Sequence, residues 1–129
     1  MTRIIAAVAA CLLFIAPAFA QNCMKWEDGQ ANAASYVASS GDRVAAVLLT
    51  PEESEATWVA MFPDSVIQAP HRLGIHIIAS VPDKAFVAGF DEAGCLTGSS
   101  PVPFGIVIDA LTAADVQSEF VNVEPGEDA

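Results

Sequence analysis

The first twenty residues limit the fold most, because they are typical of a segment that is removed from the chain. Arg3 is followed by an apolar run from Ile4 to Ala16, and Pro17 ends this run just before Ala18-Phe19-Ala20. A basic start, a short apolar stretch and a small-x-small site together predict a secretory signal peptide, residues 1–20. We expect cleavage after Ala20. The apolar run of about 13 residues is shorter than the roughly 20 that a spanning helix needs, so no membrane anchor is expected after cleavage.

Cleavage also determines the length of the mature chain, and the signal peptide predicts its location. Removal of 20 of the 129 residues leaves 109, which is enough for one core and too little for two. We expect residues 21–121 to form a single domain and residues 122–129 to be an acidic, disordered tail. The signal predicts secretion across the inner membrane to the periplasm, and the extracellular space stays open as an alternative.

Cysteine usage predicts one crosslink. Cys11 leaves with the signal peptide, so the exported chain keeps Cys23 and Cys95. Thiols pair in oxidising compartments, and we therefore predict a Cys23–Cys95 disulfide. By the chain-entropy argument, closing a loop of this length stabilises the fold by about 4 kcal/mol. The alternative, a lipid anchor on Cys11, is disfavoured because only seven apolar residues would precede it.

The charge balance excludes some classes of partner. The chain has 16 acidic and 5 basic residues, and its net charge of −11 becomes −12 when Arg3 leaves. Nucleic acids and anionic lipid surfaces are bound through Lys and Arg, so neither is expected as a partner. An acidic surface either docks a basic partner or only keeps the protein soluble. Both interpretations stay open.

The first half of the exported chain predicts two helices around one strand. Spacing of apolar residues favours a helix over 30–39 that ends at Gly41. The unbroken apolar run 44–49 predicts a central strand. Thr50-Pro51-Glu52-Glu53 has the pattern of a capping box and predicts a helix over 51–62. Its buried face is expected to hold Ala56, Val59 and Phe62, with Trp58 at the edge.

The second half predicts mainly strands. After a connection over 63–73, strands are expected over 74–81, 85–90 and from 95, then a loop over 98–101 and a further strand over 104–109. A last helix is expected from a Thr112 cap to about Phe120. Short spacings between strands favour hairpins, so the predicted class is α+β. We expect an antiparallel sheet of four or five strands packed with two or three helices and crosslinked once.

His71 and His76 are the weak candidates for a metal or acid–base site. Five steps along a strand place two side chains on opposite faces, so only a fold-back of the irregular segment would bring them together. Asp109 or Glu92 would then be a third ligand. Zinc sites need three or four protein ligands, and the chain has no spaced His/Cys set, so neither a metal nor another cofactor is expected.

Other reactive residues have structural explanations. Glu52, Glu53 and Glu55 suit a helix N-terminus, which favours negative charge. Gly98-Ser99-Ser100 lacks the second glycine of a nucleophile elbow. A cysteine nucleophile conflicts with the predicted disulfide. The aromatic residues Trp26, Trp58 and Tyr36 either fill the core or line a binding face.

The sequence therefore predicts a small exported domain without catalytic residues that docks a basic protein of the cell envelope. Two alternatives remain: an envelope enzyme or metal-binding protein using His71 and His76, and a sensor domain with a ligand cavity lined by the aromatic residues. The partner and the oligomeric state do not follow from the sequence.

Overall fold

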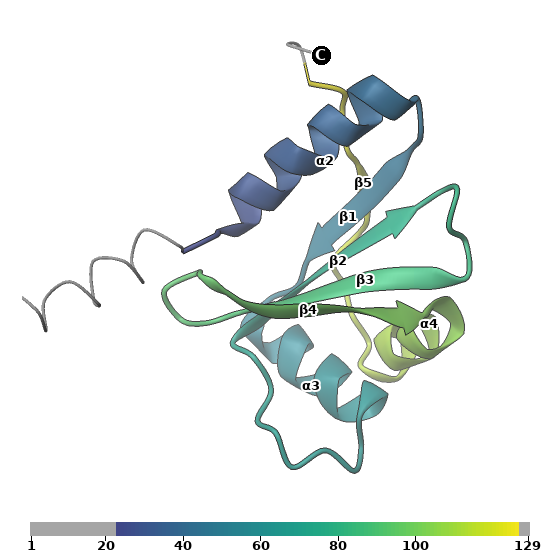
Figure 1. Cartoon of the computed structure of the whole chain (residues 1–129). Coiled ribbons are helices and arrows are strands. Elements are labelled where there is room, and N and C mark those ends of the chain that lie inside the picture. Colours follow the sequence, from purple (N-terminus) through teal and green to yellow (C-terminus); the bar gives the residue numbers. More distant parts are fainter. Residues whose placement is uncertain (1–22, 127–129) are drawn as a thin grey trace, which may run out of the picture.

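The computed structural model describes residues 23–126, which form three layers (Figure 1). Helix α2 (Trp26–Ser40) lies on one face of an antiparallel sheet, and helices α3 (Pro51–Met61) and α4 (Phe104–Ala113) lie on the other. The five strands are β1 (Val44–Leu48), β2 (Arg72–Ile78), β3 (Lys84–Phe90), β4 (Leu96–Pro103) and β5 (Val121–Asn122), in the spatial order β4-β3-β2-β1-β5. The predicted α+β class is confirmed. The predicted signal peptide, its cleavage site and residues 127–129 lie outside the described residues.

The predicted disulfide is confirmed, and it joins the two ends of a long loop. Cys23 lies just before α2 and Cys95 just before β4, with their Cα atoms 5.0 Å apart. Next to it, the Leu96 amide donates a hydrogen bond of 2.7 Å to the carbonyl oxygen of Met24. The crosslink therefore fixes the start of α2 against the β3–β4 turn.

The main core lies between the sheet and the helix pair α3 and α4. Alternation along β1, β2 and β3 turns Val47, Leu73, Ile75 and Val87 toward these helices. Val107 of α4 is fully buried in the same cluster. Because most of the large buried side chains are here, this layer holds the fold together.

The opposite face of the sheet is covered in part by α2. Trp26 stacks on His76, with 4.9 Å between ring centroids, and meets Phe90 edge-on at 6.0 Å. Gln30 Oε1 lies 2.7 Å from His76 Nε2. The sequence predicted a helix only from residue 30, but α2 already begins at Trp26. Lys25 precedes it, and the Lys25 amide donates a 2.9 Å hydrogen bond to the Asp28 carboxylate, which caps the helix.

Helix α3 begins as predicted but buries a different face. Thr50 Oγ1 accepts a hydrogen bond of 3.1 Å from the Glu53 amide, which completes the capping box. The side chains against the core are Ser54, Thr57 and Met61, whereas the predicted Ala56, Val59 and Phe62 are exposed. Small hydroxyl residues let the helix lie close to β2, where Ser54 Oγ accepts a 2.7 Å hydrogen bond from the Leu73 amide.

The segment from residue 98 to 113 differs from the prediction. The expected loop over 98–101 belongs to β4, and the expected strand over 104–109 is the first part of α4. A short apolar run fits a strand or a buried helix equally well by periodicity. Contact decides for the helix, because Val107 and Ala110, three residues apart, are both buried in the core cluster.

The expected last helix is also wrong. Thr112 Oγ1 donates to the Ile108 carbonyl oxygen at 2.9 Å inside α4, so it caps no new helix. The chain turns at Asp115, whose φ is 53°, and returns to the sheet as β5. The predicted disordered tail is wrong for its first residues, since the Val123 amide donates to Val44 O and the Gly126 amide to Ala34 O.

Candidate functional site

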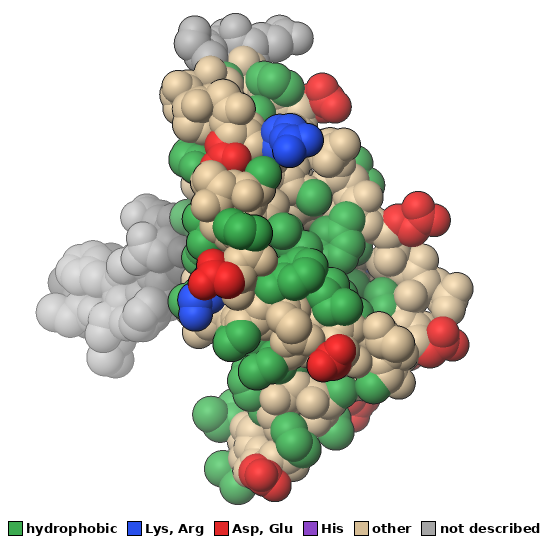
Figure 2. All heavy atoms as spheres, turned by 90° about the vertical axis from the view of Figure 1, so that its right-hand side faces the viewer, with side chains coloured by type: hydrophobic (Ala, Val, Ile, Leu, Met, Phe, Trp, Pro, Cys, Tyr) green, Lys and Arg blue, Asp and Glu red, His purple; other side chains and the backbone are tan. Residues whose placement is uncertain are grey.

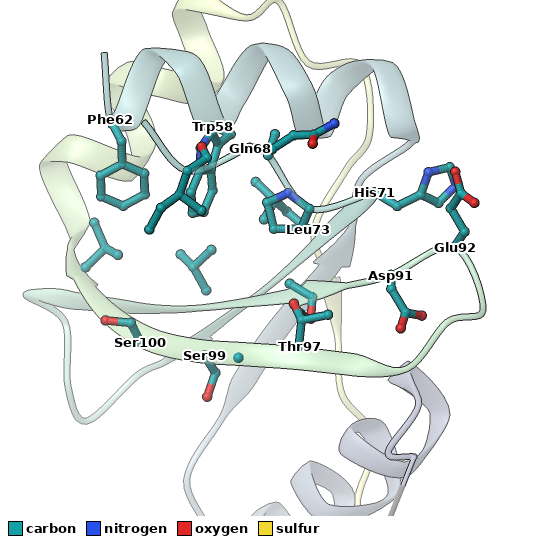
Figure 3. A pocket seen from close by; sticks show the side chains of 17 residues that line it. Trp58, Phe62, Gln68, His71, Leu73, Asp91, Glu92, Thr97, Ser99 and Ser100 are labelled. Carbon is teal, nitrogen blue, oxygen red and sulfur yellow. Dashed lines mark hydrogen bonds between the residues drawn. The ribbon is translucent and has the colours of Figure 1, made fainter. Parts of the chain in front are cut away.

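A groove of about 690 Å³ opens on the α3 side of the sheet. One wall is formed by α3 and the loop that follows it, residues 62–71, and the other wall is formed by β3 and β4 (Figure 3). Volumes of this size are usual for sites that hold a ligand. The groove is therefore the candidate site, and its side chains belong to two groups, which lie at opposite ends.

One end of the groove is apolar. Trp58 and Phe62 come from α3 and its C-terminal cap, with their rings 4.8 Å apart and edge to face. Leu73, Val87 and Val102 of the sheet also line the groove. Figure 3 shows the two aromatic rings at the end where Ser100 of β4 lies. This end offers an apolar ligand group both a flat aromatic surface and aliphatic contacts.

The other end is acidic. His71, Asp91 and Glu92 line it and lie together at one side of Figure 3. All three are exposed to solvent. A positively charged ligand group would therefore meet two carboxylates at this end, with Thr97 as a neutral polar neighbour. In a net acidic protein such an end disfavours anionic ligands.

The 62–71 loop is held in place by contacts with α3 and with β3. Helix α3 ends before Pro63, and the Trp58 indole N–H donates a 3.2 Å hydrogen bond to the Ile67 carbonyl oxygen. At the other end of the loop, Pro70 packs on β3 at Gly89, where an added Cβ would lie 2.6 Å from Pro70 Cγ. Only glycine at residue 89 leaves room for this approach.

The acidic end is fixed by the β3–β4 turn. Asp91 Oδ1 accepts a 2.9 Å hydrogen bond from the Cys95 amide, and the Asp91 amide donates to Cys95 O at 3.0 Å. Gly94, with φ of 87°, provides the left-handed residue that the turn requires. Cys95 is itself crosslinked to Cys23. The disulfide thus supports the turn that presents the two carboxylates.

Comparisons with known proteins give no relative. No protein-family model matches the chain, and no curated protein or solved structure shows significant similarity to it. The groove must therefore be interpreted from its own chemistry.

The two histidines lie in different surroundings. His71 lines the groove, whereas His76 lies on the α2 side of the sheet between Trp26 and Gln30. Burial lowers the pKa of His76. Of the carboxylates considered as a third ligand, Glu92 lines the groove with His71. Within residues 23–126, no three His, Cys, Asp or Glu side chains are grouped closely enough to hold a metal ion.

The aromatic residues divide between structure and site. Trp26 is half-buried against the sheet, and Tyr36 is 41% exposed while its hydroxyl donates to Asp42 Oδ2 at 2.8 Å. Trp58 alone of the three lines the groove. Trp26 therefore packs on the sheet, whereas Trp58 lines the candidate groove.

Glu53 has a structural role among the acidic residues near α3. Its burial acts to raise its pKa, but hydrogen bonds from Ser118 Oγ and from the Thr50, Gln117 and Ser118 amides together lower the pKa to about 2. These bonds tie the segment after α4 to the start of α3. Glu53 is therefore a structural anchor and not part of the groove.

The sequence did not indicate most of the groove. Residues 63–73 looked like a simple connection, and the Gly98-Ser99-Ser100 stretch looked like a loop. A usable signal was present in the apolar pair Val66-Ile67 between Pro63 and Pro70, which is unusual for a solvent-exposed connection.

No helix among the described residues is long and apolar enough to cross a membrane.

Proposed function

We propose that this protein is an exported, non-enzymatic binding domain that holds part of a basic partner protein of the cell envelope in the groove. The observation that carries the proposal is the groove itself, with an apolar end at Trp58 and an acidic end at Asp91 and Glu92. The net charge of −11 for the whole chain supports a basic partner, because complementary charge favours encounter and specificity.

The distribution of charge favours a local binding site rather than a broad acidic docking face. On the face that Figure 2 shows, acidic side chains are scattered singly, and hydrophobic side chains gather near the centre. Scattered carboxylates suit solubility more than docking. We therefore assign the recognition of positive charge to the end of the groove, where Asp91 and Glu92 adjoin an apolar surface.

A second candidate is a sensor domain that binds a small ligand. The observation in its favour is that the cavity is lined by the aromatic rings of Trp58 and Phe62. An enzyme centred on His71 and His76 gains no such support, because the two side chains contact different layers of the fold.

Two matched variants test whether the groove binds ligands at all. Strand alternation turns residues 98 and 100 to the same face as buried Val102, and residue 99 to the opposite face. An added Cβ at Gly98 meets nothing within 4 Å, so Gly98→Phe fills the groove without a clash at the backbone. Ser99 also borders the groove, but its side chain points away from the opposite wall (Figure 3), so Ser99→Phe adds the same ring outside the groove and is the control.

The measurement is a screen of small aromatic and amine fragments by amide NMR spectra of the isotope-labelled protein. We expect fragments to shift groove residues, Gly98→Phe to abolish these shifts and Ser99→Phe to leave them intact. If no fragment shifts groove residues, or if both variants act alike, the proposed binding function is wrong.

A further inference from the structure

We propose that the partner's bound segment is an extended, basic peptide stretch in which an aromatic or aliphatic side chain packs on Trp58 and a Lys or Arg lies between Asp91 and Glu92. This inference rests on the proposed binding function and names the ligand of the same groove. It follows from three features of the groove and its surroundings.

The first feature is the charge of one end. Asp91 is held by the turn through its bond to the Cys95 amide, and Glu92 is the next residue of the same turn. Two carboxylates on a crosslinked turn form a preorganised receptor for an ammonium or guanidinium group. An acidic or phosphorylated segment would be repelled there.

The second feature is exposed apolar surface beside the groove. Val59 is 56% exposed, Val66 100% and Ile67 69%, and all three border the hollow between α3 and its following loop. Phe62, which lines both hollows, is 37% exposed. A small amine inside the groove would leave these side chains in water. A protein segment that continues over the loop would cover them, which favours a macromolecular ligand.

The third feature is the edge strand that forms the outer wall. β4 ends the sheet, and Pro101 and Pro103 lack the amide hydrogens that a further strand would need. Addition of the ligand to the sheet is therefore blocked over this half of β4. The ligand must be recognised mainly through its side chains in the groove, which makes the apolar and basic anchors decisive.

The test uses a capped peptide, Ser-Phe-Ser-Lys-Lys-Ser, and the protein expressed from the full chain. Two matched peptides replace the Phe by Ser or both Lys by Glu. Calorimetry measures binding at low salt and at about 0.5 M salt, where surface charges are largely screened. We expect the parent peptide to bind, each replacement to weaken binding at least about tenfold, and high salt to weaken it similarly.

Variants then locate the basic anchor. Asp91→Asn with Glu92→Gln should weaken binding about tenfold or more, since it removes both carboxylates from the groove. Asp109→Asn with Glu119→Gln removes the same charge from exposed positions elsewhere and is the control. Thermal unfolding of each variant checks that it is folded; an unfolded Asp91/Glu92 double variant is replaced by Glu92→Gln alone.

The outcomes separate this inference from the proposed function. Equal weakening by the two double variants, or equal binding of the Glu peptide, would overturn the basic anchor. If fragments bind in the groove but none of the peptides does, the peptide ligand is wrong and a small-ligand domain remains. If neither fragments nor peptides bind there, the proposed function itself fails.

Discussion

The indole of Trp26 lies over Gly74, at a position in β2 where any side chain would collide with it. A Cβ added at residue 74 would meet Trp26 Cζ3 and would lie 2.7 Å from Cε3 and 3.2 Å from the Phe90 ring. The missing side chain is what lets α2 approach the sheet. The packing of α2 on β2 thus depends on the space at Gly74, so residue 74 should be sensitive to substitution.

Gly74→Ala should destabilise the protein by about 1–3 kcal/mol, because overpacking forces the Trp26 ring out of its place. Gly29→Ala is the control in the same region, since nothing lies within 4 Å of its added Cβ. Inside a helix that change should stabilise by about 0.5–1 kcal/mol. Urea unfolding followed by circular dichroism measures both. A Gly74→Ala variant as stable as the parent would show that the packing of Trp26 does not depend on the space at residue 74.

Two buried hydroxyl groups on α3 should respond in opposite ways. Ser54 and Thr57 are both 0% exposed, but Ser54 Oγ accepts from the Leu73 amide while Thr57 Oγ1 finds no partner among the described residues. Ser54→Ala should cost about 1–3 kcal/mol, since it leaves a buried amide unpaired. Thr57→Val keeps the shape and should be neutral or stabilising by up to about 1 kcal/mol. Equal losses in thermal melts would contradict this difference.

Glu53 should make the fold sensitive to acid. Its pKa is lowered from 4.5 to about 2 in the folded protein, so the unfolded chain takes up the proton first as the pH falls. The stabilisation is complete above about pH 4.5 and is lost progressively toward pH 2. Glu53→Gln should flatten this part of the stability profile and cost about 1–2 kcal/mol at neutral pH. Glu52→Gln, at an exposed position, is the control and should retain the acid dependence.

His76 should add a separate dependence at higher pH. Burial lowers its pKa below the ordinary 6.5, so the unfolded state binds the proton more readily. Stability is therefore full above about pH 6.5 and declines as the pH falls below that value. His76→Gln should reduce this decline of stability below about pH 6.5, measured by urea unfolding at several pH values. An unchanged decline in the variant would rule out this origin.

Loss of the disulfide should loosen the β3–β4 turn as well as destabilise the fold. Replacement of both Cys23 and Cys95 by Ser should cost about 2–4 kcal/mol of stability, chiefly by freeing the unfolded chain. Hydrogen exchange at Cys95 and Leu96, whose amides bond to Asp91 and Met24, should accelerate. Unchanged unfolding midpoints with and without reductant would show that the crosslink adds little.

The sequence predicted correctly those secondary-structure elements that depend on interactions between residues close together in the chain. Thr50, Pro51 and Glu53 form the expected cap because capping depends on residues three positions apart. The segment 98–120 was predicted wrongly because its apolar run suits a strand and a helix alike. Contact of Val107 and Ala110 with the core selected the helix, and no local pattern reports such a contact.

The sequence by itself determined the α+β class, the Cys23–Cys95 pair and the first elements up to α3, because periodicity, caps and cysteine count act within short stretches or by elimination. Only the tertiary structure decided where the groove lies. Its walls come from α3, the 62–71 loop, β3 and β4, and they meet because Gly89 admits Pro70 and the Trp58 indole holds the loop. Such contacts between distant segments depend on packing, which no single stretch of sequence encodes.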